Sequence, residues 1–205
     1  MRINSTDKLL QTFTTQEVEN RIPKVQECIN NLTPFYVLPG YDTTYMLVYG
    51  TLRTLRGNWE YFLQNVSNHI DTIKMVGYCK NKGIATEYTG DQDHYTVMDL
   101  FEIKEGEDVE KINAGVDSLE GSPTWYRPIL VPMEVGEETV LAKFYEMPWR
   151  TKNNRASSHD YLENFMDNLS NTERNILKEV FPKSYEFYFP NTVNTHKIEN
   201  VTIEQ

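Results

Sequence analysis

A glycine-containing segment with two arginines is the first part of the sequence whose residue types could bind a charged ligand. The run 49–58 reads YGTLRTLRGN, and Gly50 follows an apolar run and precedes an expected helix. A glycine here lets the backbone turn with successive N–H groups pointing outward, and such a nest binds carboxylate or phosphate. Arg53 and Arg56 add positive charge. The run lacks the ending of a P-loop and is not GxGxxG, so an ordinary glycine turn is the competing interpretation.

A pair of carboxylates is the second candidate. Asp117 and Glu120 lie three residues apart in the run VDSLEG, so they would share one face of a helix. Gly121 is typical of the residue just past a last helical turn. Carboxylates on a helix face are usually solvated, and the segment read alone favours that interpretation. A carboxylate enclosed in a pocket would instead have a raised pKa and could act as a general base.

Other chemistry-bearing residues favour structural interpretations. The run 157–160, SSHD, contains the residue types of a catalytic triad, but triad members converge in space rather than in sequence. No GxSxG elbow is present, so a capped helix start is expected there. The acidic run 90–94 favours a hairpin turn over a metal site. With Cys28 and Cys79 far apart and four scattered histidines, we expect no disulfide scaffold and no metal centre.

The elements that must position these residues follow from the hydrophobic periodicity. Thr14 and Glu17 predict a capped helix, and Pro23 interrupts its apolar pattern. An apolar strand ends at Tyr49, and Asn58 is the expected N-cap of the next helix. Further on we predict strands at 73–78, 83–88, 95–103, 126–131 and 139–145, a helix at 108–119, and two short helices that Pro182 ends, followed by an aromatic tail from Tyr185.

This order of elements predicts an α+β fold or a small barrel rather than a doubly wound parallel sheet. We divide the chain into an N-terminal helical extension (1–44), a central domain (45–150) and a C-terminal extension with a polar linker, helices and tail (151–205).

Composition limits the partners. The chain is 39% hydrophobic, enough for a core, and its net charge of −10 disfavours a nucleic-acid partner, since phosphate binding needs clustered Lys and Arg. No apolar run approaches the length of a membrane span, and the first residues lack the apolar run of a secretory signal. We therefore expect a cytoplasmic protein with no membrane partner.

The motifs together resemble the γ-glutamylcyclotransferase-like family, including its AIG2-like and γ-glutamylamine cyclotransferase branches. YGTLR at 49–53, Gly77-Tyr78, VDSLEG at 116–121 and WYR at 125–127 occur in the family's order, and Tyr126 follows Glu120 at the family spacing. The resemblance covers roughly residues 45–149. It implies a small mixed β-barrel with flanking helices and a cavity beneath the glycine loop.

The resemblance also implies an activity. Family members release 5-oxoproline from γ-glutamyl amines or peptides, because the substrate's own α-amine attacks its γ-carbonyl. By position, Glu120 would be the general acid/base, and Tyr126 would line the cavity. The backbone of Gly50, Thr51 and Leu52 would hold the α-carboxylate, with Tyr49 and Arg53 completing the substrate site. No metal or cofactor is implied.

Two other functions stay open. A catalytically silent family member, for example a viral one, could serve as a small-molecule or protein binding module. A hydrolase could use the same cavity with water as nucleophile, and it would release glutamate instead of 5-oxoproline.

Overall fold

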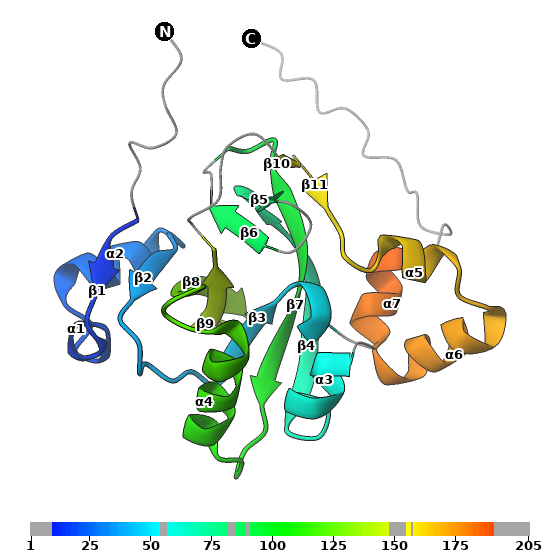
Figure 1. The fold of residues 1–205 in the computed structure, drawn as a ribbon, viewed down its shortest axis with the longest axis horizontal. Helices are drawn as coiled ribbons and strands as arrows, with labels where there is room; N and C mark the ends of the chain where they lie inside the picture. Colours follow the sequence, from blue (N-terminus) through cyan, green and yellow to red (C-terminus); the bar gives the residue numbers. More distant parts are fainter. Residues whose placement is uncertain are drawn as a thin grey trace, which may run out of the picture.

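The protein has an α+β fold in which a mixed sheet carries helices at both ends of the molecule (Figure 1). The computed structural model describes residues 10–53, 57–81, 85–88, 91–147, 155–156 and 158–190. The helical elements are α1 (Thr15–Glu19), α2 (Pro23–Asn30), η2 (Gly50–Leu52), α3 (Gly57–Phe62), α4 (Val109–Glu120), α5 (Glu163–Asp167), α6 (Asn171–Val180) and α7 (Pro182–Tyr188). The strands are β1 (Thr12–Phe13), β2 (Phe35–Val37), β3 (Tyr45–Val48), β4 (Ser67–Val76), β5 (Tyr78–Asn81), β6 (Ala85–Tyr88), β7 (Tyr95–Ile103), β8 (Arg127–Val135), β9 (Glu138–Glu146), β10 (Arg155–Ala156) and β11 (Ser158–His159).

Among the described residues, the larger sheet has eight strands in the order β1-β2-β8-β9-β3-β7-β11, and β4 pairs with β7. The contact between β3 and β9 is parallel, whereas β4 and β3 both run antiparallel to β7. A smaller sheet has the order β10-β5-β6. The described pairings form an open path that does not return to its first strand, so the expected small barrel is not confirmed.

The sheet is buried on both faces, and β7 shows why. Met98 and Leu100 belong to one apolar cluster, while Phe101 and Ile103 belong to another. Successive side chains of a strand point to opposite faces, so a strand with two covered faces has a continuous apolar run. The helix α4 and the C-terminal helices cover one face, and they enclose the cluster that contains Phe101.

The N-terminal segment is less helical than the sequence indicates. The capping box of Thr14 with Glu17 is confirmed, and the break at Pro23 separates α1 from α2. The strands β1 and β2 were not predicted, and β2 pairs antiparallel with β8. The segment therefore adds two strands to the main sheet, and the boundary at residue 44 stays a prediction.

The C-terminal segment also differs from expectation. The capping box at Ser170 and Glu173 starts α6 as predicted. The two predicted short helices are α5 and α6, and α6 ends just before Pro182 as expected. Pro182 then begins a further helix that was not predicted, because its missing N–H costs nothing in the first turn of α7. The aromatic run expected in a tail belongs to α7 and the residue after it, and Tyr185 and Tyr188 pack on the core.

The predicted linker contains two short strands. Ser158–His159 forms β11 beside β7, so the expected helix start at 157–160 is wrong for these two residues. Asp160 does act as a cap-like residue, since its carboxylate accepts the Leu162 N–H at 2.9 Å just before α5. Ser157 lies outside the described residues.

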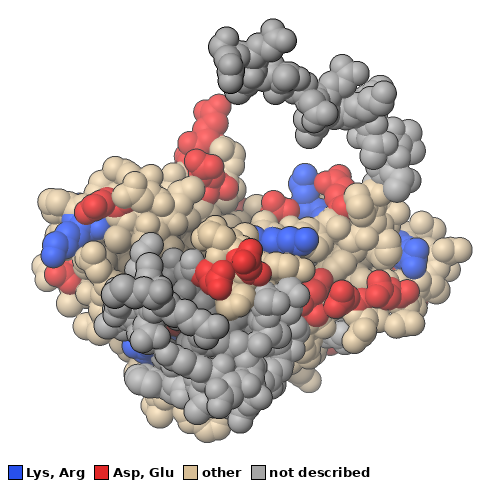
Figure 2. Space-filling model, turned by 90° about the horizontal axis from the view of Figure 1, so that it is seen from above, with Lys and Arg blue, Asp and Glu red and all other residues tan. Residues whose placement is uncertain are grey.

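On the face seen from above, acidic side chains are spread over the described surface with basic ones scattered between them (Figure 2). In the part of the chain that the structure describes, no helix has both the length and the apolar character needed to cross a bilayer.

Candidate functional site

The glycine loop leaves β3 as a single 3-10 turn, η2. Gly50 begins the turn with a φ of +73°, a left-handed conformation that L side chains adopt only with strain. In a helical turn the first N–H groups have no carbonyl acceptor within the turn. In η2 the Arg53 N–H donates to the Gly50 carbonyl at 3.2 Å, and it is the only backbone N–H of this loop that is hydrogen-bonded among the described residues. The backbone N–H groups of Gly50, Thr51 and Leu52 are therefore able to bind an anion.

The helix that carries the two carboxylates is capped at both ends. The Asp108 side chain accepts the Lys111 N–H at 2.9 Å and begins α4. Gly121 ends it in the left-handed conformation, with a φ of +59°, and its N–H donates to the Ser118 carbonyl. Glu120 is thus fixed at the last position of α4, as the sequence predicts.

Glu120 and the glycine loop meet at one small cavity. The cavity has a volume of about 10 Å³, which is room for about one water molecule. Its lining residues are Leu47, Val48, Tyr49, Leu52, Glu120 and Tyr145. The structure therefore brings Glu120 together with Tyr49 and Leu52, residues that are about 70 positions away in the sequence.

The environment of Glu120 favours its neutral form. The side chain is half-buried, and burial raises the pKa of its carboxyl group from 4.5 to about 7. A carboxyl group with a pKa near neutrality can both accept and return a proton at physiological pH.

Asp117 does not lie on a solvated face. Its carboxylate accepts hydrogen bonds from the Tyr145 hydroxyl at 2.6 Å and from the Lys143 ammonium at 3.1 Å. Lys143 is 1% exposed and also donates to the Asn113 side chain at 3.2 Å. Burial and the neighbouring Asp117 raise the pKa of Tyr145 well above its usual range, so Tyr145 stays a neutral donor beside Glu120.

Arg53 lies inside the protein. Its guanidinium is fully buried and donates to Asp160 at 2.6 Å, to Asp99 at 3.1 Å and to the Tyr188 hydroxyl at 2.8 Å. Burial alone would raise the pKa of Asp99, but Arg53 and His69 together outweigh burial and hold that pKa below the usual range. The charge of Arg53 is thus balanced internally, and we assign it the anchoring of η2 in place of the expected contact with substrate.

Asp99 connects this ion pair to the sheet and to α7. The Thr72 hydroxyl donates to the Asp99 carboxylate at 2.8 Å, and the Thr72 and Ser184 hydroxyls bond each other at 2.6 Å. The group formed by Arg53, Asp99, Asp160, Thr72, Ser184 and Tyr188 is called the Arg53 cluster below.

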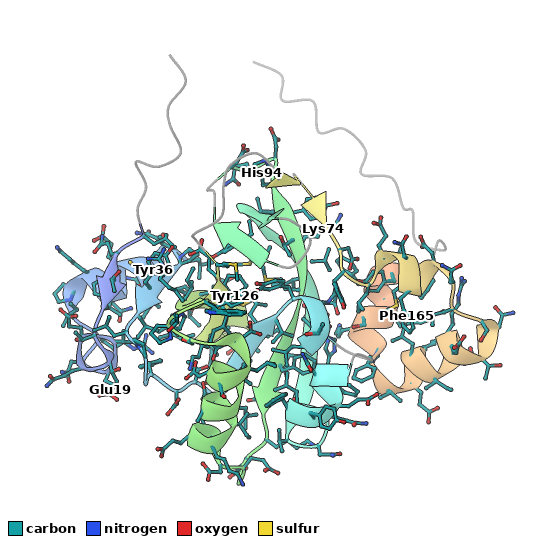
Figure 3. All side chains as sticks on the ribbon, in the orientation of Figure 1. Glu19, Tyr36, Lys74, His94, Tyr126 and Phe165 are labelled. Atoms are coloured by element: carbon teal, nitrogen blue, oxygen red, sulfur yellow. The ribbon has the colours of Figure 1, made fainter. Side chains whose placement is uncertain are left out.

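The remaining predicted site residues lie around the loop and the end of α4. Tyr126 lies just before β8 (Figure 3). It is half-buried, packs against the core cluster that includes Leu52 and Tyr145, and is not among the residues that line the small cavity. Thr51 is exposed, and its hydroxyl accepts the Asn58 side chain at 2.8 Å. Asn58 lies inside α3 and not at its N-cap, and Arg56 is outside the described residues.

Sequence reasoning missed Tyr145, Lys143 and Asp99 as neighbours of the site. Tyr145 is the last residue of the predicted strand at 139–145. The alternation of side chains defines the two faces of that strand, but it does not say which face lies against Glu120. An aspartate in the apolar run 95–103 was the available signal for Asp99, because a charge in a buried strand needs a buried partner.

Comparisons with known proteins show a likeness to solved structures only. No family model and no curated protein matches the chain. The uncharacterized protein PH0828 from Pyrococcus horikoshii is 18% identical with a TM-score of 0.44, over 61% of this chain and 95% of that one. YkqA from Bacillus subtilis is 21% identical with a TM-score of 0.43, over 61% of this chain and 42% of its own length. The ytfP protein from Escherichia coli is 12% identical with a TM-score of 0.39, over 59% of this chain and 98% of that one. At these identities and TM-scores the likeness assigns no activity to this chain.

Proposed function

We propose that the protein is a γ-glutamylcyclotransferase-type lyase that releases 5-oxoproline and a free amine from a γ-glutamyl amine or peptide. The observation that carries this proposal is Glu120, a half-buried carboxyl group with a pKa of about 7 in one cavity with the glycine loop. The family resemblance of YGTLR, VDSLEG and WYR supports it.

In the proposed reaction, the free N–H groups of η2 hold the substrate's α-carboxylate, as a nest of amides binds an anion. Ionised Glu120 takes one proton from the α-ammonium, whose free pKa is about 8, so the proton transfer is nearly balanced. The amine nitrogen then forms a bond to the γ-carbonyl carbon. Glu120 returns the proton to the leaving nitrogen as the amide C–N bond breaks, which regenerates the carboxylate. The ring nitrogen still carries one proton more than the lactam, and Glu120 passes this second proton to the freed amine, which leaves as an ammonium ion.

Two features reduce what the protein must do to catalyse this reaction. Ring closure joins two ends of one molecule, so holding the chain folded supplies much of the rate. The neutral Tyr145 hydroxyl is held by Asp117 at 2.6 Å and lines the same cavity, where it keeps one wall of the site in place. A γ-glutamyl group is larger than one water molecule, so the cavity must widen when substrate binds.

That small volume is also the observation that favours the second candidate, a catalytically silent binding module. A protein that no longer turns over substrate has no need for an open cavity at Glu120.

Mass spectrometry after incubation with glutathione, γ-glutamyl amines and γ-glutamyl dipeptides tests the proposal. We expect 5-oxoproline from the parent protein and from Glu110→Gln, a matched change at an exposed glutamate of α4. We expect none from Glu120→Gln. Release of glutamate in place of 5-oxoproline would identify a hydrolase, and silence from all three folded proteins would favour the binding module.

A further inference from the structure

A cleft much larger than the cavity at Glu120 lies between α3, the start of β4 and the C-terminal helices α6 and α7. Its volume is about 440 Å³, within the usual range of small-molecule sites. Its lining residues are Trp59, Gln64, Asn65, Ser67, Asn68, His69, Phe101, Val180 and Phe181.

The floor of the cleft is made of buried rings. Trp59, Phe101 and Phe181 are 7%, 1% and 6% exposed, and the His69 side chain is 5% exposed. The rings contact one another edge to face, with centroids 5.3 Å apart for Trp59 and Phe181 and 5.4 Å apart for His69 and Phe101. This packing fixes the floor before any ligand arrives.

The rim of the cleft is polar and uncharged. Gln64, Asn65 and Asn68 are exposed and carry side-chain amides at the opening. Among the residues that the structure describes, no Asp, Glu, Lys or Arg lines the cleft, and the nearby Lys104 ammonium is already engaged, donating to the Asn65 carbonyl at 2.8 Å. A ligand with a phosphate or another full charge would find no opposite charge there, so the chemistry suits a neutral molecule with a hydrogen-bonding edge.

One donor in the wall has no partner. The Trp59 indole N–H is buried and makes no hydrogen bond to any described residue. Buried polar groups in proteins are almost always hydrogen-bonded, so an orphan donor in the wall of a cleft indicates a missing acceptor.

His69 is held in place from behind the cleft. Its Nε2 atom lies 3.2 Å from the Thr72 hydroxyl and 3.3 Å from the Ser184 hydroxyl, both members of the Arg53 cluster. The floor is therefore fixed to the same network that anchors η2.

We propose that this cleft binds an uncharged nucleobase compound, either a nucleoside or a free base. The apolar floor gives a planar base a surface to pack against, and the amides of Asn and Gln pair with base edges through two hydrogen bonds. A carbonyl of the base accepts the Trp59 N–H. Because no Lys or Arg of the described residues lines the cleft, the site favours the nucleoside over its phosphorylated form. This site is separate from Glu120, and the proposal does not depend on the lyase reaction.

A titration of the full chain with adenosine and uridine, followed through the tryptophan indole N–H signals in ¹⁵N-resolved NMR, tests the proposal. Trp59→Phe identifies the Trp59 signal by its loss. We expect that signal to shift saturably, while the signal of Trp125, which is 67% exposed in the connection between α4 and β8, stays in place. Removing the rim amides in a Gln64→Ala, Asn68→Ala variant is expected to weaken binding about tenfold. Asn164→Ala, an exposed amide on α5 outside the cleft, is the matched control and should bind as the parent does.

Three outcomes would overturn the proposal. The first is no shift of the Trp59 signal at about 5 mM nucleoside. The second is a shift with glucose or galactose but not with nucleosides, which would replace the ligand class. The third is equal or tighter binding of adenosine monophosphate, which contradicts the uncharged lining. Thermal unfolding of each variant ensures that only folded proteins are compared.

Discussion

Replacing Glu120 by glutamine should stabilise the protein at high pH and leave its stability nearly unchanged at low pH. The pKa of Glu120 is raised from 4.5 to about 7 in the folded protein, so folding penalises its ionised form. Below about pH 4.5 the group is protonated in both the folded and the unfolded states and contributes no difference. Between about pH 4.5 and pH 7 the unfolded state is ionised while the folded state keeps its proton, so stability falls across this range and levels off above it.

The expected size follows from these two pKa values. Their difference corresponds to about 3 kcal/mol in the free energy of unfolding, reached above about pH 7. Urea denaturation of the parent and of Glu120→Gln at about pH 4 and about pH 8.5 measures it, because other titrating groups cancel between the two proteins. Glu110→Gln, an exposed change on the same helix, should show no such gain. A gain of equal size at both pH values would refute the burial argument.

Three further changes test the loop, the helix end and the chemistry. Arg53→Met should cost about 3–5 kcal/mol in urea denaturation, because it leaves the fully buried Asp99 without its cation; a cost below about 1 kcal/mol would contradict the ion pair's importance. Gly121→Ala should lower the free energy of unfolding by about 1 kcal/mol, since its φ is +59°. For the proposed reaction, kcat/KM should rise about tenfold per pH unit up to about pH 7 and fall again above about pH 8, because the reaction needs ionised Glu120 together with the substrate's α-ammonium; a rate that does not change between about pH 5 and pH 7 would exclude Glu120 as the base.

Local patterns predicted most of the elements that build the site. The strand at 95–103 has the bounds of β7, and the helix at 108–119 is α4 within one residue. Both rest on periodicity within a single element. The two strands β1 and β2 have only two and three residues, too few to show any alternation, so pairing with the rest of the sheet decides them.

Long-range partners could not be predicted from the sequence. Arg53 appears there as a cation in a glycine loop, which suggests a contact with substrate. Its partners Asp99 and Asp160 are 46 and 107 residues away. In the same way, Asp117 appears as a solvated helix residue until the fold brings Lys143 and Tyr145 beside it. Which polar side chains meet is decided by packing, and periodicity does not encode it.

The C-terminal helices are part of the architecture of both candidate sites. Asp160, Ser184 and Tyr188 come from this segment, and all three belong to the Arg53 cluster that anchors η2. Phe181 and Val180 from the same segment form one wall of the cleft at His69. A buried ion pair adds little net stability, because desolvation offsets its Coulomb attraction, but it tolerates few alternative geometries. The Arg53 cluster therefore fixes where α7 packs on β4, and this one docking arrangement both holds the glycine loop opposite Glu120 and closes the cleft.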